Sequence, residues 1–278
     1  MGEMIHSPLI TLSSDFGSGN VGCAAMEGVI FGICPEAKVI HWCHAIPGFD
    51  IKDGARQLEG VACLRQGFHV CVVDPGVGTR RRGIAVQTGR GDVLIGPDNG
   101  VLRPAAELLG GIVVAVELTN EKYQRTPVSP IFHGRDIFAP AAAHLARGVE
   151  LRELGASVEL AMLTPSPYAE ARWEGPRLHC EVIHINENGS LFLNVRAEEF
   201  QKNLKRGEGV EIIFGTKKIL LSYCETFGSV PKGEALILND DFGRAQASVN
   251  QGNFAFTFGV KRGQKLLIQK RTALREET

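Results

Sequence analysis

The chain has 278 residues, of which 44% are hydrophobic and 22% charged, and its formal net charge is −1. This balance is ordinary for a globular protein and excludes the broad basic surface of a nucleic-acid-binding protein. No apolar run reaches the roughly 18 residues that a membrane span requires, and the N-terminus lacks a signal-peptide pattern. The seven cysteines include no CxxC pair. We therefore expect a cytoplasmic protein with reduced thiols, and neither a nucleic-acid nor a membrane partner.

The first half of the chain alternates between strand-like and helix-like segments. Apolar positions at helical spacing predict helices at residues 24–33, 51–64 and 136–146. Apolar runs that end at turn residues predict strands at residues 8–14, 38–43, 68–73 and 111–118, and the runs 83–87 and 92–96 are typical of a hairpin. This order favours an α/β domain with a mostly parallel sheet flanked by helices.

The second half has a different texture. A proline-rich stretch at residues 162–176 predicts a linker. Short, turn-separated β-like runs follow it, at residues 177–185, 190–195, 210–214, 218–221, 235–238 and 265–269. We expect an α/β domain of residues 1–172 and a smaller all-β domain of residues 173–278.

Polar side chains follow several predicted strands at the point where each strand ends. Asp15, His44, Asp74 and Asp98 all occupy such positions. In an open α/β sheet, ligands bind beyond the carboxyl ends of the parallel strands. We therefore expect these residues to share one rim.

The segment Gly17–Gly22 is a literal GxGxxG between a predicted strand and a predicted helix. Asp15 places a carboxylate where a pyrophosphate would lie, and no acidic residue ends the second strand. In a chain with 33 glycines we interpret the match as chance.

Seven carboxylate and imidazole side chains could also be assembled into a two-metal hydrolase site, because hard cations prefer such ligands. Their spacing matches no compact ligand motif, and Arg81 would oppose a cation, so we expect no metal ion. The seven are Asp15, His44, Asp50, Asp74, Asp98, His133 and Asp136.

Asp74, Arg81 and His133 form a sharper hypothesis. A carboxylate beside a guanidinium stays ionised and orients it, and an added imidazole gives three groups able to hold a water molecule for attack. Taken singly, Asp74 could equally cap a turn and Arg81 could be solvated. Phe49 and Tyr223 could pack, or could offer a purine their ring faces.

Four motifs are spread along nearly the whole first domain: Leu12–Gly17, Val72–Arg81, Gly96–Gly100 and Phe132–Pro140. With them, the sequence resembles the SAM hydroxide adenosyltransferase family, the S-adenosyl-L-methionine hydrolases (adenosine-forming), which is similar to fluorinase and chlorinase. The resemblance implies that Asp74, Arg81 and His133 hold the attacking water. Further substrate-binding residues that it implies are Asp15 at the ribose, Phe49 beside the sugar, and Gly134, Asn194, Tyr223, Asp241 and Val249.

The second half departs from the family pattern. Asn186 stands where the family has an aspartate, and Asp241 and Gln246 replace a serine and a glutamate. The missing carboxylate at position 186 weakens the expected grip on a methionine ammonium group.

The resemblance implies water attack at the ribose 5′ carbon, with no metal and no cofactor. It also implies a homotrimer in which the second domain completes the nucleoside pocket of a neighbouring subunit. Halide transfer fits less well, because an anionic Asp74 repels a halide. Two alternatives stay open at this point: a non-catalytic nucleoside-binding protein and a metal-dependent hydrolase.

Overall fold

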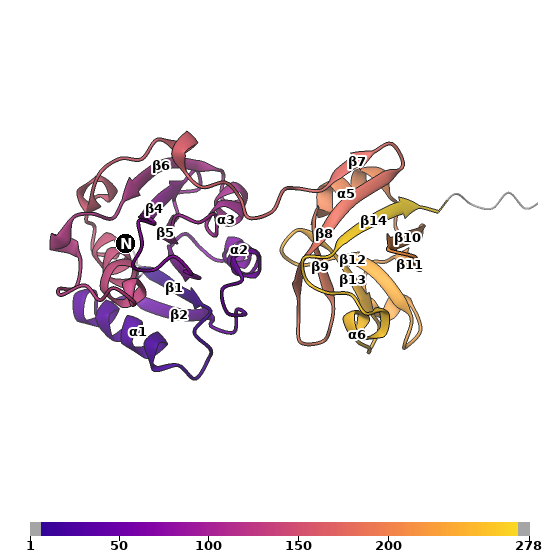
Figure 1. Ribbon diagram of the computed structural model, residues 1–278, viewed down its shortest axis with the longest axis horizontal. Coiled ribbons are helices and arrows are strands. Elements are labelled where there is room, and N and C mark those ends of the chain that lie inside the picture. Colours follow the sequence, from indigo (N-terminus) through magenta and orange to yellow (C-terminus); the bar gives the residue numbers. More distant parts are fainter. Residues whose placement is uncertain (1–6, 272–278) are drawn as a thin grey trace, which may run out of the picture. The chain divides into compact units, whose positions relative to one another are not determined.

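The computed structural model describes residues 7–271 and divides the chain into two compact units, Met1–Pro167 and Tyr168–Thr278 (Figure 1). The boundary predicted near residue 172 falls inside strand β7 (Arg172–Glu174). That strand pairs with β8 (Arg177–Ile185), so it belongs to the sheet of the second unit. No helix among the described residues is long and apolar enough to cross a membrane.

The first unit is built on one six-stranded sheet in the order β2-β1-β3-β5-β4-β6. β1 is parallel to β2 and β3, and β3 is parallel to β5, whereas β4 is antiparallel to both of its neighbours. The α/β class and the hairpin are therefore confirmed, but the sheet is mixed, and its parallel pairings are confined to four strands. The strands are β1 (Leu9–Ser14), β2 (Lys38–Cys43), β3 (Phe68–Val72), β4 (Gly83–Thr88), β5 (Val93–Pro97) and β6 (Ile112–Glu117).

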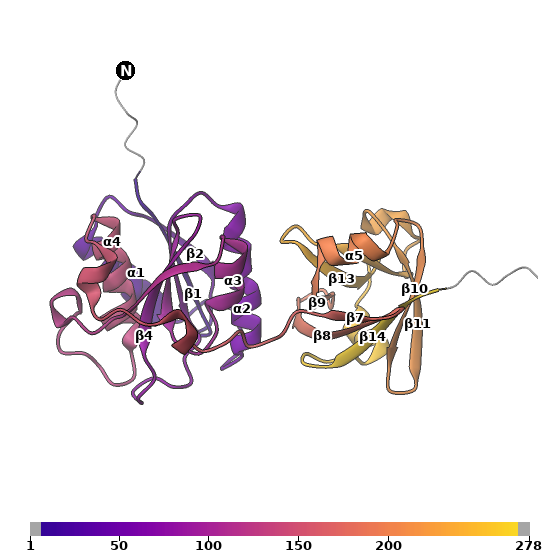
Figure 2. The same ribbon diagram turned by 90° about the horizontal axis from the view of Figure 1, so that it is seen from above.

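Helices cover both faces of this sheet (Figure 2). α1 and α4 pack together on one face, and α2 and α3 pack together on the other. The four are α1 (Val21–Ile33), α2 (Ile51–Glu59), α3 (Arg103–Leu108) and α4 (Ala139–Ala146). Short helical turns complete the unit: η1 (Gly60–Cys63), η2 (Glu121–Tyr123), η3 (Gly134–Phe138), η4 (Leu151–Leu154) and η5 (Leu160–Met162).

The carboxyl ends of β1 and β3 position two of the residues expected at the substrate, Asp15 and Asp74. β1 and β3 are central and parallel, and both are almost fully buried, because both sheet faces are covered. Their apolar side chains pack with Met26 and Ile30 of α1. β1 ends at Ser14 and is followed by Asp15, and β3 ends at Val72, two residues before Asp74. Because the two strands are parallel, Asp15 and Asp74 lie at the same end of the sheet.

The second unit is a closed sheet. Its strand order is β14-β10-β11-β12-β13-β9-β8-β7, and an additional β14–β8 pairing closes it. Two short helices also belong to it, so the expected all-β domain is β-rich instead. The remaining elements are β9 (Leu191–Arg196), α5 (Ala197–Asn203), β10 (Gly209–Phe214), β11 (Lys217–Tyr223), η6 (Phe227–Ser229), β12 (Ala235–Asn239), β13 (Arg244–Val249), α6 (Phe254–Phe258) and β14 (Lys265–Lys270).

Candidate active site

A pocket of about 350 Å³ opens at the carboxyl ends of β1 and β3 in the first unit. Five of the residues expected at the substrate line it together, although they come from four separate stretches of chain. They are Asp15, Phe49, Asp74, His133 and Gly134. The other lining residues are Phe16, Asn20, Gly48, Val72, Val77, Ile131 and Phe132.

Asp74 is held by Arg81 through both carboxylate oxygens. Arg81 Nε donates to Asp74 Oδ1 at 2.9 Å, and Arg81 Nη2 donates to Asp74 Oδ2. Only 9% of the Arg81 side chain and 5% of the Asp74 side chain are exposed, so the pair is only weakly screened by solvent. The guanidinium also lies 5.4 Å from the centre of the Phe138 ring. Arg81 therefore fixes the carboxylate without itself lining the pocket.

The third member, His133, is held by the same guanidinium. Arg81 Nη2 lies 3.1 Å from His133 Nδ1. Arginine can only donate, so Nδ1 accepts, and the neutral imidazole carries its proton on Nε2. Burial, and then the positive charge of Arg81, lower the pKa of His133 from its ordinary 6.5. Near neutral pH the site thus presents an anionic Asp74 and a neutral His133 with a free Nε2–H donor.

Close backbone contact brings these two distant stretches together. Gly78 has a φ of 75°, and a Cβ there would strike the carbonyl oxygen of Pro130. Only glycine meets both conditions, so the loop after Asp74 can lie against the segment that precedes His133. A side chain at Gly134 would crowd Met26 Sδ at 3.2 Å, so α1 also limits that position.

Asp136 serves this loop and not the pocket. Its fully buried carboxylate accepts from the backbone N–H of Ser129 at 2.9 Å and pairs with Arg125 and Arg135. These contacts hold the pKa of Asp136 below its usual range against the opposing effect of burial, which is the largest single influence on it. The carboxylate thereby fixes the turn that carries His133.

Asp15 and Phe49 meet at the rim. The backbone N–H of Phe49 donates to Asp15 Oδ2 at 2.8 Å. Phe49 has a φ of 64°, a left-handed conformation that is rare for an aromatic residue, and 74% of it is exposed. Its ring is therefore presented at the pocket mouth. The rings of Phe16 and Phe132 pack edge to face, with centres 5.8 Å apart, and form part of the pocket wall.

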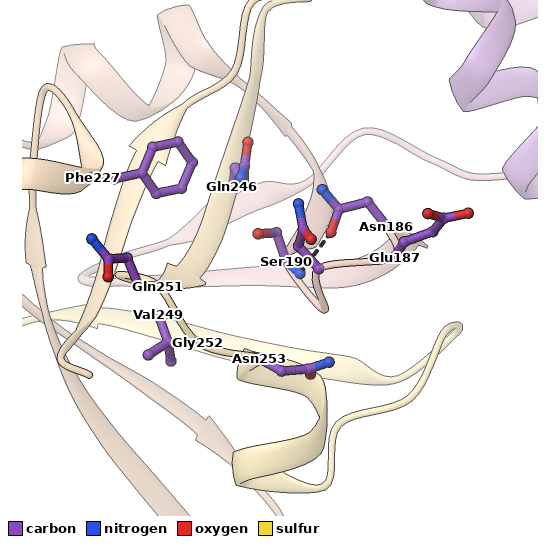
Figure 3. A pocket seen from close by; sticks show the side chains of 10 residues that line it. Asn186, Glu187, Ser190, Phe227, Gln246, Val249, Gln251, Gly252 and Asn253 are labelled. Carbon is purple, nitrogen blue, oxygen red and sulfur yellow. Dashed lines mark hydrogen bonds between the residues drawn. The ribbon is translucent and has the colours of Figure 1, made fainter. Parts of the chain in front are cut away.

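The second unit holds a separate and more polar pocket of about 610 Å³ (Figure 3). Gln246 Nε2 donates to Ser248 Oγ, and Ser248 Oγ bonds to Ser190 Oγ, each at 2.9 Å. Glu187 carries the only ionisable side chain of the lining, so a ligand there would meet amides, hydroxyls and one carboxylate. The lining residues are Asn186, Glu187, Asn188, Ser190, Phe227, Gln246, Val249, Gln251, Gly252 and Asn253.

Four residues expected at the substrate lie in this unit, and only Val249 lines its pocket. Asn194 is buried, donates to the carbonyl of Ala169 and accepts from the N–H of Glu181, each at 2.6 Å. Tyr223 is 1% exposed, and its hydroxyl accepts from Asn239 at 2.8 Å. Asp241 is exposed on the turn between β12 and β13. A role for these three in substrate binding stays a prediction.

The fold brings Asp15, Asp74 and His133 of the alternative metal set to one pocket and engages the other members elsewhere. Asp98 pairs with Arg82, Asp50 caps α2, and His44 bonds to Ser14. Between residues 7 and 271, no three or more His, Cys, Asp or Glu side chains are grouped to hold a metal ion.

Several lining residues carried no sequence prediction. Phe16 and Phe132 stand beside predicted residues inside the quoted motifs, and that adjacency was the available signal. Phe227 and Gln251 in the second pocket had no such signal, since the pairing of β13 with β12 and β9 brings together the segments that line it.

Two family models match the chain. Residues 10–155 match the SAM hydroxide adenosyltransferase N-terminal domain, and residues 180–267 match the C-terminal domain of the same family. The chain is 38% identical over 266 residues to a protein of Salinispora tropica named (R)-S-adenosyl-L-methionine hydrolase, a match that covers 95% of this chain and 99% of that protein.

Two further comparisons find proteins that are similar over nearly the whole chain. The chain is 23% identical over 305 residues to a fluorinase of an Actinoplanes species, with 95% of this chain and 98% of that protein covered. A solved structure of an uncharacterized conserved protein from Thermotoga maritima is similar, with a TM-score of 0.88 and 28% identity, covering 94% of this chain and 99% of that one.

Proposed function

The chain belongs to the SAM hydroxide adenosyltransferase family, and we propose that it hydrolyses S-adenosyl-L-methionine, or a related adenosyl sulfonium, to adenosine and L-methionine. The observation that carries the proposal is the bonded set of Asp74, Arg81 and His133, two of which line a pocket shared with Asp15 and Phe49. Relatives that carry the hydrolase name match nearly the whole length of the chain.

In this proposal the first-unit pocket holds the ribose and its 5′ carbon. Asp15 accepts hydrogen bonds from ribose hydroxyls, and the exposed ring of Phe49 covers the sugar. Gly134 lets the start of η3 pack closely against Val72 and Met26, which keeps His133 at the pocket. These residues therefore orient the nucleoside, while Asp74 and His133 hold the attacking water.

Asp74 and His133 position the water for in-line attack. Water donates to the Asp74 carboxylate and accepts from the Nε2–H of His133, while Arg81 prevents both side chains from turning. The new bond forms between the water oxygen and the 5′ carbon, and the carbon–sulfur bond breaks with its electron pair going to sulfur. The proton leaves toward Asp74 and then to solvent.

The reaction needs little activation of the leaving group. The sulfonium departs as neutral methionine, so no proton has to be donated to it. The site's main contribution is alignment and exclusion of bulk water. An anionic Asp74 at the position of attack disfavours a halide as the nucleophile, because like charges repel.

We further propose that the second unit of a neighbouring subunit completes each pocket in a homotrimer. The rim of the first-unit pocket exposes apolar side chains, with Phe49 74% and Ile131 80% accessible, and such a rim is typical of a surface covered by a partner. The amide-rich pocket around Gln246 would then take the adenine and the amino-acid end. A cytoplasmic location fits the seven free cysteines.

One incubation tests the reaction. Purified protein is mixed separately with the two sulfonium epimers of S-adenosyl-L-methionine in heavy-oxygen water, and the products are separated by chromatography with mass detection. We expect adenosine whose 5′ hydroxyl carries the heavy oxygen, together with unlabelled methionine. Adenosine without the label would mean that its 5′ oxygen came from a group other than water, such as a protein carboxylate, and would contradict direct attack by water. Intact substrate with both epimers would overturn the proposal. Added chloride or fluoride is expected to yield no halogenated nucleoside.

A further inference from the structure

A chain of hydrogen-bonded side chains runs behind the wall of the substrate pocket. Ser14 Oγ lies 2.7 Å from His44 Nδ1, and His44 Nε2 lies 2.7 Å from His41 Nδ1. His41 Nε2 lies 3.1 Å from a carboxylate oxygen of Glu27 on α1. The outer end of this chain opens into a separate cavity of about 540 Å³, whose lining includes His44, His41 and Glu27. The chain therefore links a solvent-accessible surface to the end of β1.

The chemistry of the four groups gives the chain one direction. An ionised Glu27 can only accept, so His41 donates through Nε2, and a neutral His41 then accepts at Nδ1. His44 must supply that proton from its own Nε2, which leaves its Nδ1 to accept from the hydroxyl of Ser14. Every proton thus has one place as long as both imidazoles are neutral.

The inner end of the chain holds the turn that builds the pocket wall. Ser14 is fully buried, and its oxygen accepts from the backbone N–H of Phe16 at 3.3 Å. The carbonyl oxygen of His44 accepts from the backbone N–H of Gly17 at 2.8 Å. His44 therefore secures both ends of the short turn that presents Asp15 and Phe16 to the substrate pocket, although it does not line that pocket itself.

We propose that Glu27, His41 and His44 are positioning residues of the substrate pocket, and that nucleoside affinity depends on the protonation of His44. This inference rests on the proposed function, in which Asp15 binds the ribose.

Adding one proton to His44 reverses its bond to Ser14. A doubly protonated His44 donates from both nitrogens, so its Nε2–H still reaches His41 Nδ1 but its Nδ1 no longer accepts from the Ser14 hydroxyl. Ser14 Oγ then receives two donors, Phe16 N–H and His44 Nδ1–H, and its buried hydroxyl proton loses His44 as an acceptor. A buried donor that loses its acceptor costs free energy, so the observed Ser14–Gly17 turn becomes less favourable.

The surroundings set the pH at which this happens. Burial, and then the neighbouring His41, lower the pKa of His44 from its ordinary 6.5. The other titratable groups around the pair are Cys23 and Glu27 from α1, Cys43 from β2, and Asp15 after β1. The Ser14–Gly17 turn is therefore held near neutral pH, and it loosens as the pH falls through the lowered pKa of His44.

Calorimetric titration with adenosine tests the inference without requiring turnover. For the wild-type protein we expect the Kd for adenosine to rise by roughly fivefold between about pH 8 and about pH 5. Glu27→Gln keeps an acceptor for His41 but removes the negative charge. Its acid limb, which is the rise in the Kd for adenosine at low pH, should therefore move to lower pH by roughly half a unit. The Kd near pH 8 should stay within about twofold of the wild-type value.

Two variants at His44 separate positioning from simple structural support. His44→Asn offers an amide near the place of Nδ1, so we expect it to retain the bond to Ser14 and near-normal affinity while losing the acid limb. His44→Leu should raise the Kd by roughly tenfold at every pH, because Ser14 loses its partner. Ser18→Ala serves as the control, because Ser18 lines the outer cavity but is not one of the four hydrogen-bonded residues. Its Kd for adenosine should match that of the wild type at every pH.

The outcomes are distinct. An acid limb that stays in place in Glu27→Gln, or normal affinity in His44→Leu, overturns the inference, as does a wild type that binds no adenosine. Turnover of S-adenosyl-L-methionine is measured in parallel near pH 8. Its absence in a protein that binds adenosine with the expected pH dependence counts against the proposed hydrolysis and supports the positioning chain.

Discussion

Single side chains at this site each perform more than one task. Asp74 faces the pocket while both of its oxygens are held by Arg81, and the same guanidinium decides which nitrogen of His133 carries the proton. The reactive geometry thus depends on one buried arginine that never lines the pocket. A lysine could not replace it, because a single ammonium cannot bind the carboxylate at two points and the imidazole together.

Replacing Asp74 by asparagine should remove the acceptor for the water's proton. We expect kcat to fall by about 10²- to 10⁴-fold, with a much smaller change in KM. Asp98→Asn is a matched control, because Asp98 forms a comparable pair with Arg82 outside the pocket. It should lower the melting temperature and leave kcat nearly unchanged, and an equal loss of kcat in both variants would contradict the assignment.

The pH dependence of kcat should report His133. Only its neutral form accepts from Arg81, and burial and Arg81 lower its pKa below 6.5. Activity is therefore fully present above 6.5 and is lost as the pH falls through the lowered pKa. His144 also has a lowered pKa but packs against Tyr123, so His144→Gln should leave the kcat profile unchanged. A limb above 6.5 would sink this interpretation.

At the scale of elements, the approach of helices to the parallel strands sets the pocket. The predicted helix at residues 136–146 begins two residues earlier as the π-helical turn η3, which places His133 directly at its start. α2 packs behind the end of β3, where a Cβ on Gly54 would lie 2.8 Å from Val73 Cγ2. Val73 immediately precedes Asp74, so this packing reaches the carboxylate that we propose holds the water.

Two alanine substitutions distinguish close helix packing from simple helix propensity. Gly54→Ala should destabilise the protein by about 1–3 kcal/mol and lower kcat, because α2 must move away from Val73. Gly28→Ala in α1 meets nothing within 4 Å and should stabilise it by about 0.5–1 kcal/mol. Urea unfolding and kcat measure both effects, and a stabilising Gly54→Ala would show that the contact with Val73 is not tight.

At the scale of the whole molecule, the proposed trimer predicts complementation between inactive subunits. Asp74→Asn disables the first unit, and Asn188→Trp fills the pocket of the second unit, so each homogeneous protein should be inactive. Mixed trimers with intersubunit sites should recover about one quarter of wild-type activity, since each site needs two intact halves. Light scattering should give a mass near three chains of 30.1 kDa. No recovery on mixing would mean that sites are not shared.

The sequence by itself determined the α/β class and the common edge of the sheet. Residues 68–73 form the nearly continuous apolar run of a buried parallel strand, and residues 8–14 a strand that ends at Asp15, which placed Asp15 and Asp74 on one rim. The motifs supplied His133 and Arg81. The burial of Tyr223 could also have been predicted from the sequence. Ile219, Leu221 and Tyr223 stand at alternate positions of β11 and therefore share its buried face.

Only the tertiary structure decided how these residues work together. The hydrogen bond from Phe49 to Asp15 spans 34 positions of sequence, and the proton location on His133 depends on a guanidinium 52 residues away. The pocket around Gln246 exists because β13 pairs with β9, which brings Gln246 and Val249 beside the turn between β8 and β9. Such contacts depend on side-chain directions and long-range pairing, which local propensity and period do not encode.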